Sequence, residues 1–156
     1  MKLARGFTLI EMLVVAAMMS VLALAALPLA DIAQHRSRER ELRAALLEIR
    51  QALDAYKRLH DAALQGRAAQ GSGFPPSLEA LEEGWTGLPG APVAAQRLLR
   101  RLPRDPFAPE GVPAAQSWGL RSYASPARAP RPGTDVYDVY SLSERMGSNG
   151  IPLAQW

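Results

Sequence analysis

The strongest constraint on the fold is an apolar run at residues 12–30, which directly follows Gly6-Phe7-Thr8-Leu9-Ile10-Glu11. The run is made almost entirely of Leu, Val, Ala and Met, and about 20 such residues suffice for a helix that spans a bilayer. One acid, Glu11, stands near its start. Because an ionisable side chain at that depth costs about 2.5–3.5 kcal/mol on insertion scales, we expect Glu11 to have a function and a charged partner.

A short basic leader precedes this run and allows two interpretations. Residues 1–5 carry Lys2 and Arg5, and residues 23–25 read Ala-Leu-Ala, which resembles the cleavage site of an ordinary signal peptide. In that interpretation the chain is a secreted binding domain released by signal peptidase. The length of the run and the acid Glu11 argue against it, because the apolar region of a signal peptide is shorter and uncharged.

The second interpretation is cleavage after Gly6. With Gly6, Phe7 and Glu11 behind a short basic leader, the N-terminus closely resembles the class III signal of type IV pilins and pseudopilins. The resemblance implies that a prepilin peptidase cuts after Gly6 and methylates the new N-terminus at Phe7. It also implies that the apolar helix stays behind as a membrane anchor and later becomes the filament core.

The electrostatics of the segment agree with this cleavage. A cut before Phe7 creates a cationic amine at the edge of an apolar phase, and Glu11 is the only acid nearby. Burying a carboxylate alone is expensive, and pairing it with an amine recovers much of that cost. We therefore expect Glu11 to pair with the N-terminal amine of a neighbouring subunit. Pro28 is expected to produce either a simple kink or, as the resemblance implies, a local loosening of the helix during filament packing.

The helix is predicted to continue to residue 65, because no Gly or Pro occurs between Pro28 and Gly66. Apolar side chains recur there at spacings of three and four, which marks one helical face: Leu42, Ala45, Leu46, Ile49, Leu53, Tyr56 and Ala63. The charged residues 35–41 are predicted to be a collar against lipid headgroups or a solvated helix face. The apolar face needs a cover, which the rest of the chain must supply.

Turn residues and strand-like stretches follow. Glycines mark a loop at residues 65–73, Ser77 is predicted to cap a short helix, and glycines and prolines predict an irregular connection at residues 84–92. The aromatic and β-branched stretches 118–124 and 136–142 are predicted to form an antiparallel pair.

The predicted fold class is α+β, with a long N-terminal helix packed against a small antiparallel sheet and extended loops, as in type IV pilins. The predicted division is a leader at 1–6, a transmembrane and filament-core helix at 7–30, an amphipathic continuation at 31–65 and a globular region at 66–156.

The globular region adds a narrower resemblance. The order of Phe74-Pro75, residues 99–107, Trp118-Gly119, residues 139–142 and Trp156 looks like that of the major, G-type pseudopilin of type II secretion systems. In that family the Leu-Pro-x-Asp-Pro element packs the loop region, and a C-terminal loop with several Asp residues binds calcium. Two departures stand out in this chain, an insertion at residues 108–117 and a C-terminal loop without an Asp pair.

The departure in the C-terminal loop bears on metal binding. Calcium takes six to eight oxygen ligands, usually including carboxylates. Glu144, Ser148 and Asn149 are the weak candidates here, and Arg145 beside them opposes a cation. We therefore expect no cofactor and no metal, with calcium at these three residues as the alternative.

Several function classes are disfavoured. The chain has no Cys, so thiolate chemistry is excluded, and its net charge of +3 is too small to argue for nucleic acid. No catalytic motif is present. Asp135 and Asp138 lie at odd spacing on a strand-like stretch, and they are predicted to be solvated edge charges. His60 is predicted at the surface or an edge.

The predicted function is therefore that of a non-enzymatic structural subunit of a type II secretion pseudopilus, which drives protein export across the outer membrane. The alternative within the same class is a major or minor type IV pilus subunit for adhesion, motility or DNA uptake. The resemblance implies prepilin peptidase, an inner-membrane assembly platform, other pseudopilins and copies of the chain as partners. It also implies a single-pass protein of the bacterial inner membrane with its C-terminal part in the periplasm.

Overall fold

The computed structural model describes residues 7–64, 71–88 and 91–156, without the side chains of residues 24–30 and 91–93. The chain divides into two compact units, Met1–Ser37 and Arg38–Trp156, which are described separately. Helix α1 (Leu9–Leu64) is 56 residues long and is the one long helix predicted from the sequence. The predicted loop at 65–73 lies mostly outside the described residues.

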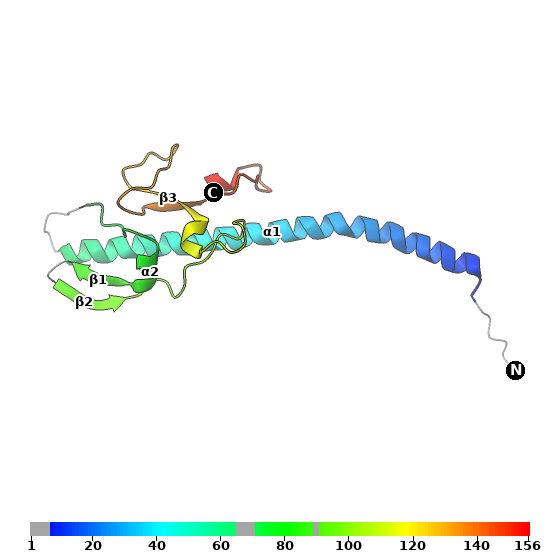
Figure 1. Cartoon of the computed structure of the whole chain (residues 1–156), viewed down its shortest axis with the longest axis horizontal. Coiled ribbons are helices and arrows are strands. Elements are labelled where there is room, and N and C mark those ends of the chain that lie inside the picture. The colour runs from blue at the N-terminus through cyan, green and yellow to red at the C-terminus, as the bar shows by residue number, and fades with distance from the viewer. Residues whose placement is uncertain (1–6, 65–70, 89–90) are drawn as a thin grey trace. The chain divides into compact units, whose positions relative to one another are not determined.

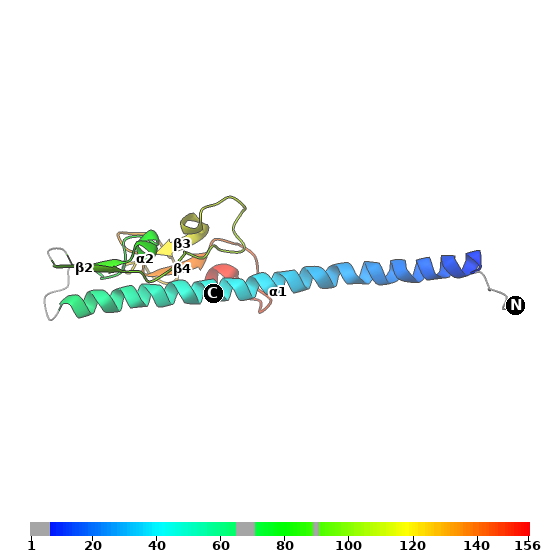
Figure 2. The same ribbon diagram turned by 90° about the horizontal axis from the view of Figure 1, so that it is seen from below.

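The apolar face of α1 supplies one side of the core in the C-terminal unit. Leu42, Ile49 and Leu53 are fully or almost fully buried, as their helical spacing predicted. The cover comes from several later segments of the chain, and its buried residues are Leu78, Leu81, Leu99, Leu102, Trp118, Val136, Val139 and Leu153. Figure 2 shows the short helix and the strands gathered along this part of α1. The fold class is α+β, as predicted.

The predicted antiparallel pair is present as strands β3 (Trp118–Arg121) and β4 (Asp138–Ser141). Both strands are shorter than expected, because the Ser122 N–H turns away to the Arg131 carbonyl in the loop. Gly119 lies opposite Tyr140, and a Cβ at Gly119 would meet the Tyr140 ring at 2.4 Å. Only glycine leaves room for that ring.

The prediction of an irregular connection at residues 84–92 is wrong. This stretch contains strand β1 (Trp85–Leu88), which pairs with β2 (Ala91–Gln96) in a second antiparallel sheet (Figure 1). Pro92 lies within β2, and a two-stranded sheet tolerates proline because each strand has an unpaired edge. Gly84 adopts φ +95°, and its Cα approaches the backbone of Gln96 so closely that a side chain would clash there.

Helix α2 (Glu79–Glu83) begins one residue later than predicted, at Leu78 as N-cap and without a side-chain cap. The Ser77 capping prediction is therefore wrong. Leu78 and Leu81 point into the core as expected. The Glu82 carboxylate accepts a hydrogen bond of 2.6 Å from the Leu102 N–H, so this acid fastens the next segment of chain.

Asp105 holds the segment around residues 98–107 to β4. Its carboxylate is fully buried and accepts hydrogen bonds from the Ser141 hydroxyl at 2.6 Å and from the Phe107 N–H at 2.7 Å. The Asp105 N–H donates to Ser117 Oγ at 3.0 Å. The Trp118 indole donates to the Pro103 carbonyl at 2.9 Å. This segment is turned and extended, as its prolines predicted.

Replacing Asp105 with Ala should lower the free energy of unfolding, because the buried Ser141 hydroxyl and the part-buried Phe107 N–H lose their acceptor, and a buried donor without a partner costs about 1–3 kcal/mol. The measurement is urea unfolding of the full chain in detergent, followed by tryptophan fluorescence. Glu110→Ala is the control, since Glu110 is exposed and should change stability by less than about 0.5 kcal/mol. Equal effects of the two variants would contradict this account of Asp105.

Candidate assembly site

The N-terminal end of α1 is capped by Thr8. Its hydroxyl accepts a hydrogen bond of 3.3 Å from the Glu11 N–H, and its carbonyl accepts one from the Met12 N–H. Glu11 lies in the first turn, where the positive end of the helix dipole favours an acid. Sequence reasoning missed the role of Thr8, although Thr and Glu three residues apart are the signature of a capping box.

Large apolar side chains surround this capped end and stay exposed. Phe7 has 77% of its surface exposed, and the Glu11 side chain is exposed as well. The exposed large apolar residues of this stretch are Phe7, Leu9, Ile10, Met12, Leu13, Val14, Val15, Met18, Met19, Val21 and Leu22. An uncovered apolar surface of this extent marks a region that contacts a partner or lipid.

The structure reaches only some of the residues predicted for this site. Gly6 lies outside the described residues, and so does the side chain of Pro28, although α1 is helical through that position. Cleavage after Gly6, methylation at Phe7 and an ion pair at Glu11 stay predictions. The predicted membrane span at 7–30 includes residues 24–30, whose side chains the structure does not describe. Within the described part of the chain, no helix combines the length and the apolar character that membrane crossing requires.

The comparisons with known proteins bear on this end of the chain. Residues 1–27 match the family described as the prokaryotic N-terminal methylation motif. The chain carries a prepilin-type methylation motif. The motif supports a type IV pilin-like protein, and it extends over the first 27 of 156 residues. Neither the curated proteins nor the solved structures gave a match.

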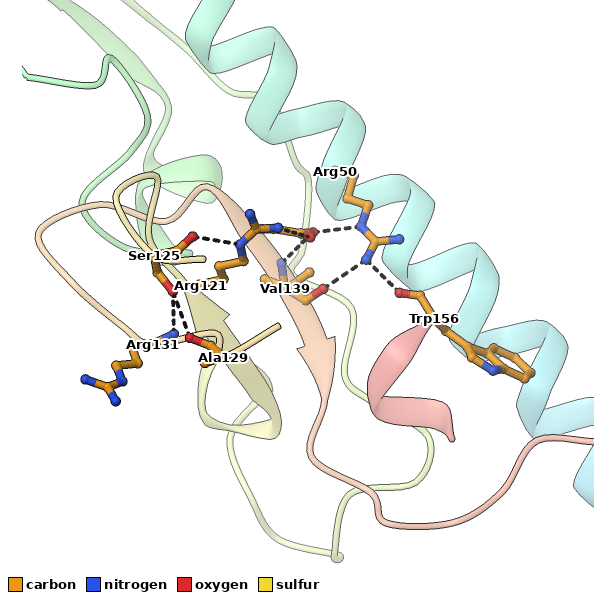
Figure 3. Close-up of polar contacts among 8 residues, drawn as sticks. Arg50, Arg121, Ser125, Ala129, Arg131, Val139 and Trp156 are labelled. Carbon is orange, nitrogen blue, oxygen red and sulfur yellow. Dashed lines mark hydrogen bonds and ion pairs between the residues drawn. The ribbon is translucent and has the colours of Figure 1, made fainter. Parts of the chain in front are cut away.

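In the C-terminal unit, Arg50 joins α1 to β4 and to Trp156. Its Nε donates to Asp138 Oδ1 at 2.8 Å, and one terminal nitrogen donates to the Val139 and Trp156 main-chain oxygens at 3.2 and 2.8 Å (Figure 3). Asp138 was predicted to be a solvated edge charge, and that prediction is wrong. The planar guanidinium reaches these three acceptors with donors on two separate nitrogens held in a fixed plane, a spread that the single nitrogen of an ammonium does not have.

The loop between β3 and β4 is tied back in the same region. Arg121 donates to the Ser125 carbonyl at 3.3 Å, and the Ser125 hydroxyl accepts a hydrogen bond of 2.8 Å from the Arg131 N–H (Figure 3). The Arg121 guanidinium also lies 5.1 Å from the centre of the Tyr137 ring. These contacts give the proline-rich loop a defined course.

Glu39 fastens the C-terminal loop to α1. Its carboxylate accepts hydrogen bonds from the Ser148 N–H at 2.6 Å and from the Ser148 hydroxyl at 2.5 Å. Only 3% of Glu39 is exposed. The prediction that the charged residues 35–41 form a headgroup collar or a solvated face is therefore wrong for Glu39. Sequence spacing could not show this, because the partner lies 109 residues away.

The structure does not bring the three weak calcium candidates, Glu144, Ser148 and Asn149, together around a common point. Ser148 donates to Glu39, the Asn149 side-chain oxygen accepts a hydrogen bond from the Ile151 N–H, and Glu144 is exposed. Among the described residues, no three acidic, His or Cys side chains are grouped as metal ligands. Calcium binding stays untested, and the expectation that no metal binds stays a prediction.

The distal part of α1 carries a small charged cluster. The Lys57 ammonium donates to the Asp61 carboxylate at 2.5 Å, and this hydrogen bond holds the pKa of Asp61 below its usual value. His60 was predicted at the surface or an edge, yet only 15% of its side chain is exposed. A Cβ at Gly73 would lie 2.8 Å from His60 Nδ1, so the chain after the loop packs on this histidine.

Replacing Arg50 with Lys should destabilise the C-terminal unit by about 1–3 kcal/mol, since hydrogen bonds to charged groups are lost. The lower end of that range is expected, because the Arg50 side chain is 37% exposed and partly screened. Urea unfolding gives the stability, and amide hydrogen exchange at residues 138–156 shows whether that segment loosens. Arg58→Lys is the matched control, because Arg58 is exposed on the same helix. Unchanged exchange in the Arg50 variant would contradict the role assigned to Arg50.

Proposed function

We propose that the chain is a non-enzymatic subunit of a type II secretion pseudopilus, a pilin-like filament that drives protein export. The observation that carries the proposal is the methylation motif over residues 1–27, within which the first part of α1 carries exposed apolar side chains. Prepilin peptidase would remove residues 1–6, and apolar helices of neighbouring copies would then cover one another. The buried carboxylate of Asp105, in the Leu-Pro-Arg-Asp-Pro stretch, supports the pseudopilin resemblance.

The motif fits a type IV pilus subunit equally well, so this is the second candidate. In both cases the chain would be anchored in the inner membrane with its C-terminal unit in the periplasm, and an assembly platform would insert it into the filament. Expression in a strain that lacks its principal pseudopilin separates the two. Restored export supports the pseudopilus, whereas surface fibres without restored export support the pilus.

Cleavage is tested by replacing Gly6 with Val in cells that contain prepilin peptidase. We expect the wild-type protein to begin with N-methylated Phe7 and the variant to stay at full length, because a branched side chain blocks the bond that is cut. Intact mass and N-terminal sequencing give the result. Ala4→Val is the matched control and should be cut normally. A mature wild-type protein that begins near Ala26 would be the product of signal peptidase and would contradict the proposal.

The role of Glu11 is tested by the Glu11→Gln substitution. The amide keeps the size of the side chain but cannot neutralise a neighbouring amine, so we expect normal cleavage and a loss of fibres by about tenfold or more. Fibres sheared from cells are quantified against total protein. Glu110→Gln is the control, because Glu110 is an exposed acid of the C-terminal unit. Wild-type fibre yield from Glu11→Gln would rule out the ion pair.

A further inference from the structure

A groove of about 540 Å³ runs beside α1 in the C-terminal unit. Its wall is mainly apolar, and its principal residues are Arg43, Leu46, Leu47, Arg50, Ile151 and Trp156. Leu47 and Ile151 are 58% and 44% exposed. Since one water takes about 30 Å³, the groove has room for side chains of a partner.

The charge in this groove comes from Arg43. Its guanidinium stacks 4.2 Å from the centre of the Trp156 ring, which fixes its plane. Arg50 is already bonded to Asp138, Val139 and Trp156, whereas within the described part of the chain no hydrogen bond or ion pair is recorded for Arg43. A stacked guanidinium with an open edge is suited to a carboxylate.

The same helix presents acids on another exposed side. Glu41, Ala44 and Glu48 are exposed and recur at spacings of three and four, so they share one face. Glu48 follows Arg43 by five residues, which places it about 140° further around the helix axis at 100° per residue. The core residues occupy the remaining side. We call the exposed surface of Glu41, Ala44 and Glu48 the acidic face.

We propose that the groove beside Arg43 and Trp156 of one copy receives the acidic face of a second copy, with Glu48 on the Arg43 guanidinium. The two surfaces are opposite in charge and lie on different sides of the helix. A contact between unlike surfaces does not close on itself and can repeat from copy to copy. The inference rests on the proposed function, because it names the lateral contact within the filament.

The chain has no Cys, so disulfide cross-linking reports only on introduced residues. Ala44→Cys on the acidic face is combined with Gln155→Cys, since Gln155 also lines the groove, and both Arg43 and Glu48 stay in place. The full chain is oxidised in membranes and run on a non-reducing gel. We expect a ladder of covalent multimers from this double variant and monomers from each single variant. In a second double variant, Ile151→Cys takes the place of Gln155→Cys as the groove position. The control combines Ala44→Cys with Ala129→Cys on the exposed β3–β4 loop, and it should give no ladder.

Charge reversal then tests the ion pair in the same background. Arg43→Glu and Glu48→Arg should each lower the ladder yield by about tenfold, because like charges then face each other. The two reversals together should restore it. Arg128→Glu, a reversal at an exposed position of the β3–β4 loop, should leave the yield unchanged.

The outcomes separate this inference from the proposed function. Dimers from single-Cys chains would show a symmetric contact and overturn the inference. Fibres that form while neither groove pair cross-links would also overturn it and leave the proposed function standing. A ladder that survives both single charge reversals would overturn the Arg43–Glu48 pair. A charge-dependent ladder from a chain that makes no fibres would support the contact and contradict the proposed filament.

Discussion

Exposing a wide apolar stripe of an amphipathic helix to water is unfavourable. The C-terminal unit is organised around covering the apolar stripe of α1 between Leu42 and Leu53. No single later element is large enough to do so. A five-residue helix, the β3–β4 sheet and several loops share the task. A sheet of two strands is marginal alone, so α1 acts as the surface on which β3–β4 becomes stable.

Polar side chains of α1 determine where the cover is attached. Glu39 holds the C-terminal loop through Ser148, and Arg50 holds β4 and the Trp156 main chain. Asp105 performs a similar task within the cover by joining its own segment to Ser141. Hydrophobic burial stabilises the unit without specifying position, whereas these directional contacts select one arrangement of the loops.

Much of the fold could be predicted because local patterns encode it. The spacing of Leu42, Ile49 and Leu53 gave the buried helix face, and the aromatic and β-branched stretches gave β3 and β4. The β1–β2 sheet was missed because Gly87 and Pro92 are turn residues that lie inside its strands. At the candidate site, Gly6, Phe7 and Glu11 formed a readable motif. The buried state of Glu39 and the ion pair of Asp138 could not be predicted, because their partners lie 109 and 88 residues away in the sequence.

The three indoles of the chain lie in different surroundings. Trp85 and Trp118 are buried in the sheet regions, while Trp156 is half-buried against the Arg43 guanidinium. Their emission should therefore differ in wavelength and in access to soluble quenchers. A spectroscopic change confined to Trp156 would report release of the C-terminal segment while the sheets stay intact, which makes the native chain its own optical sensor of that step.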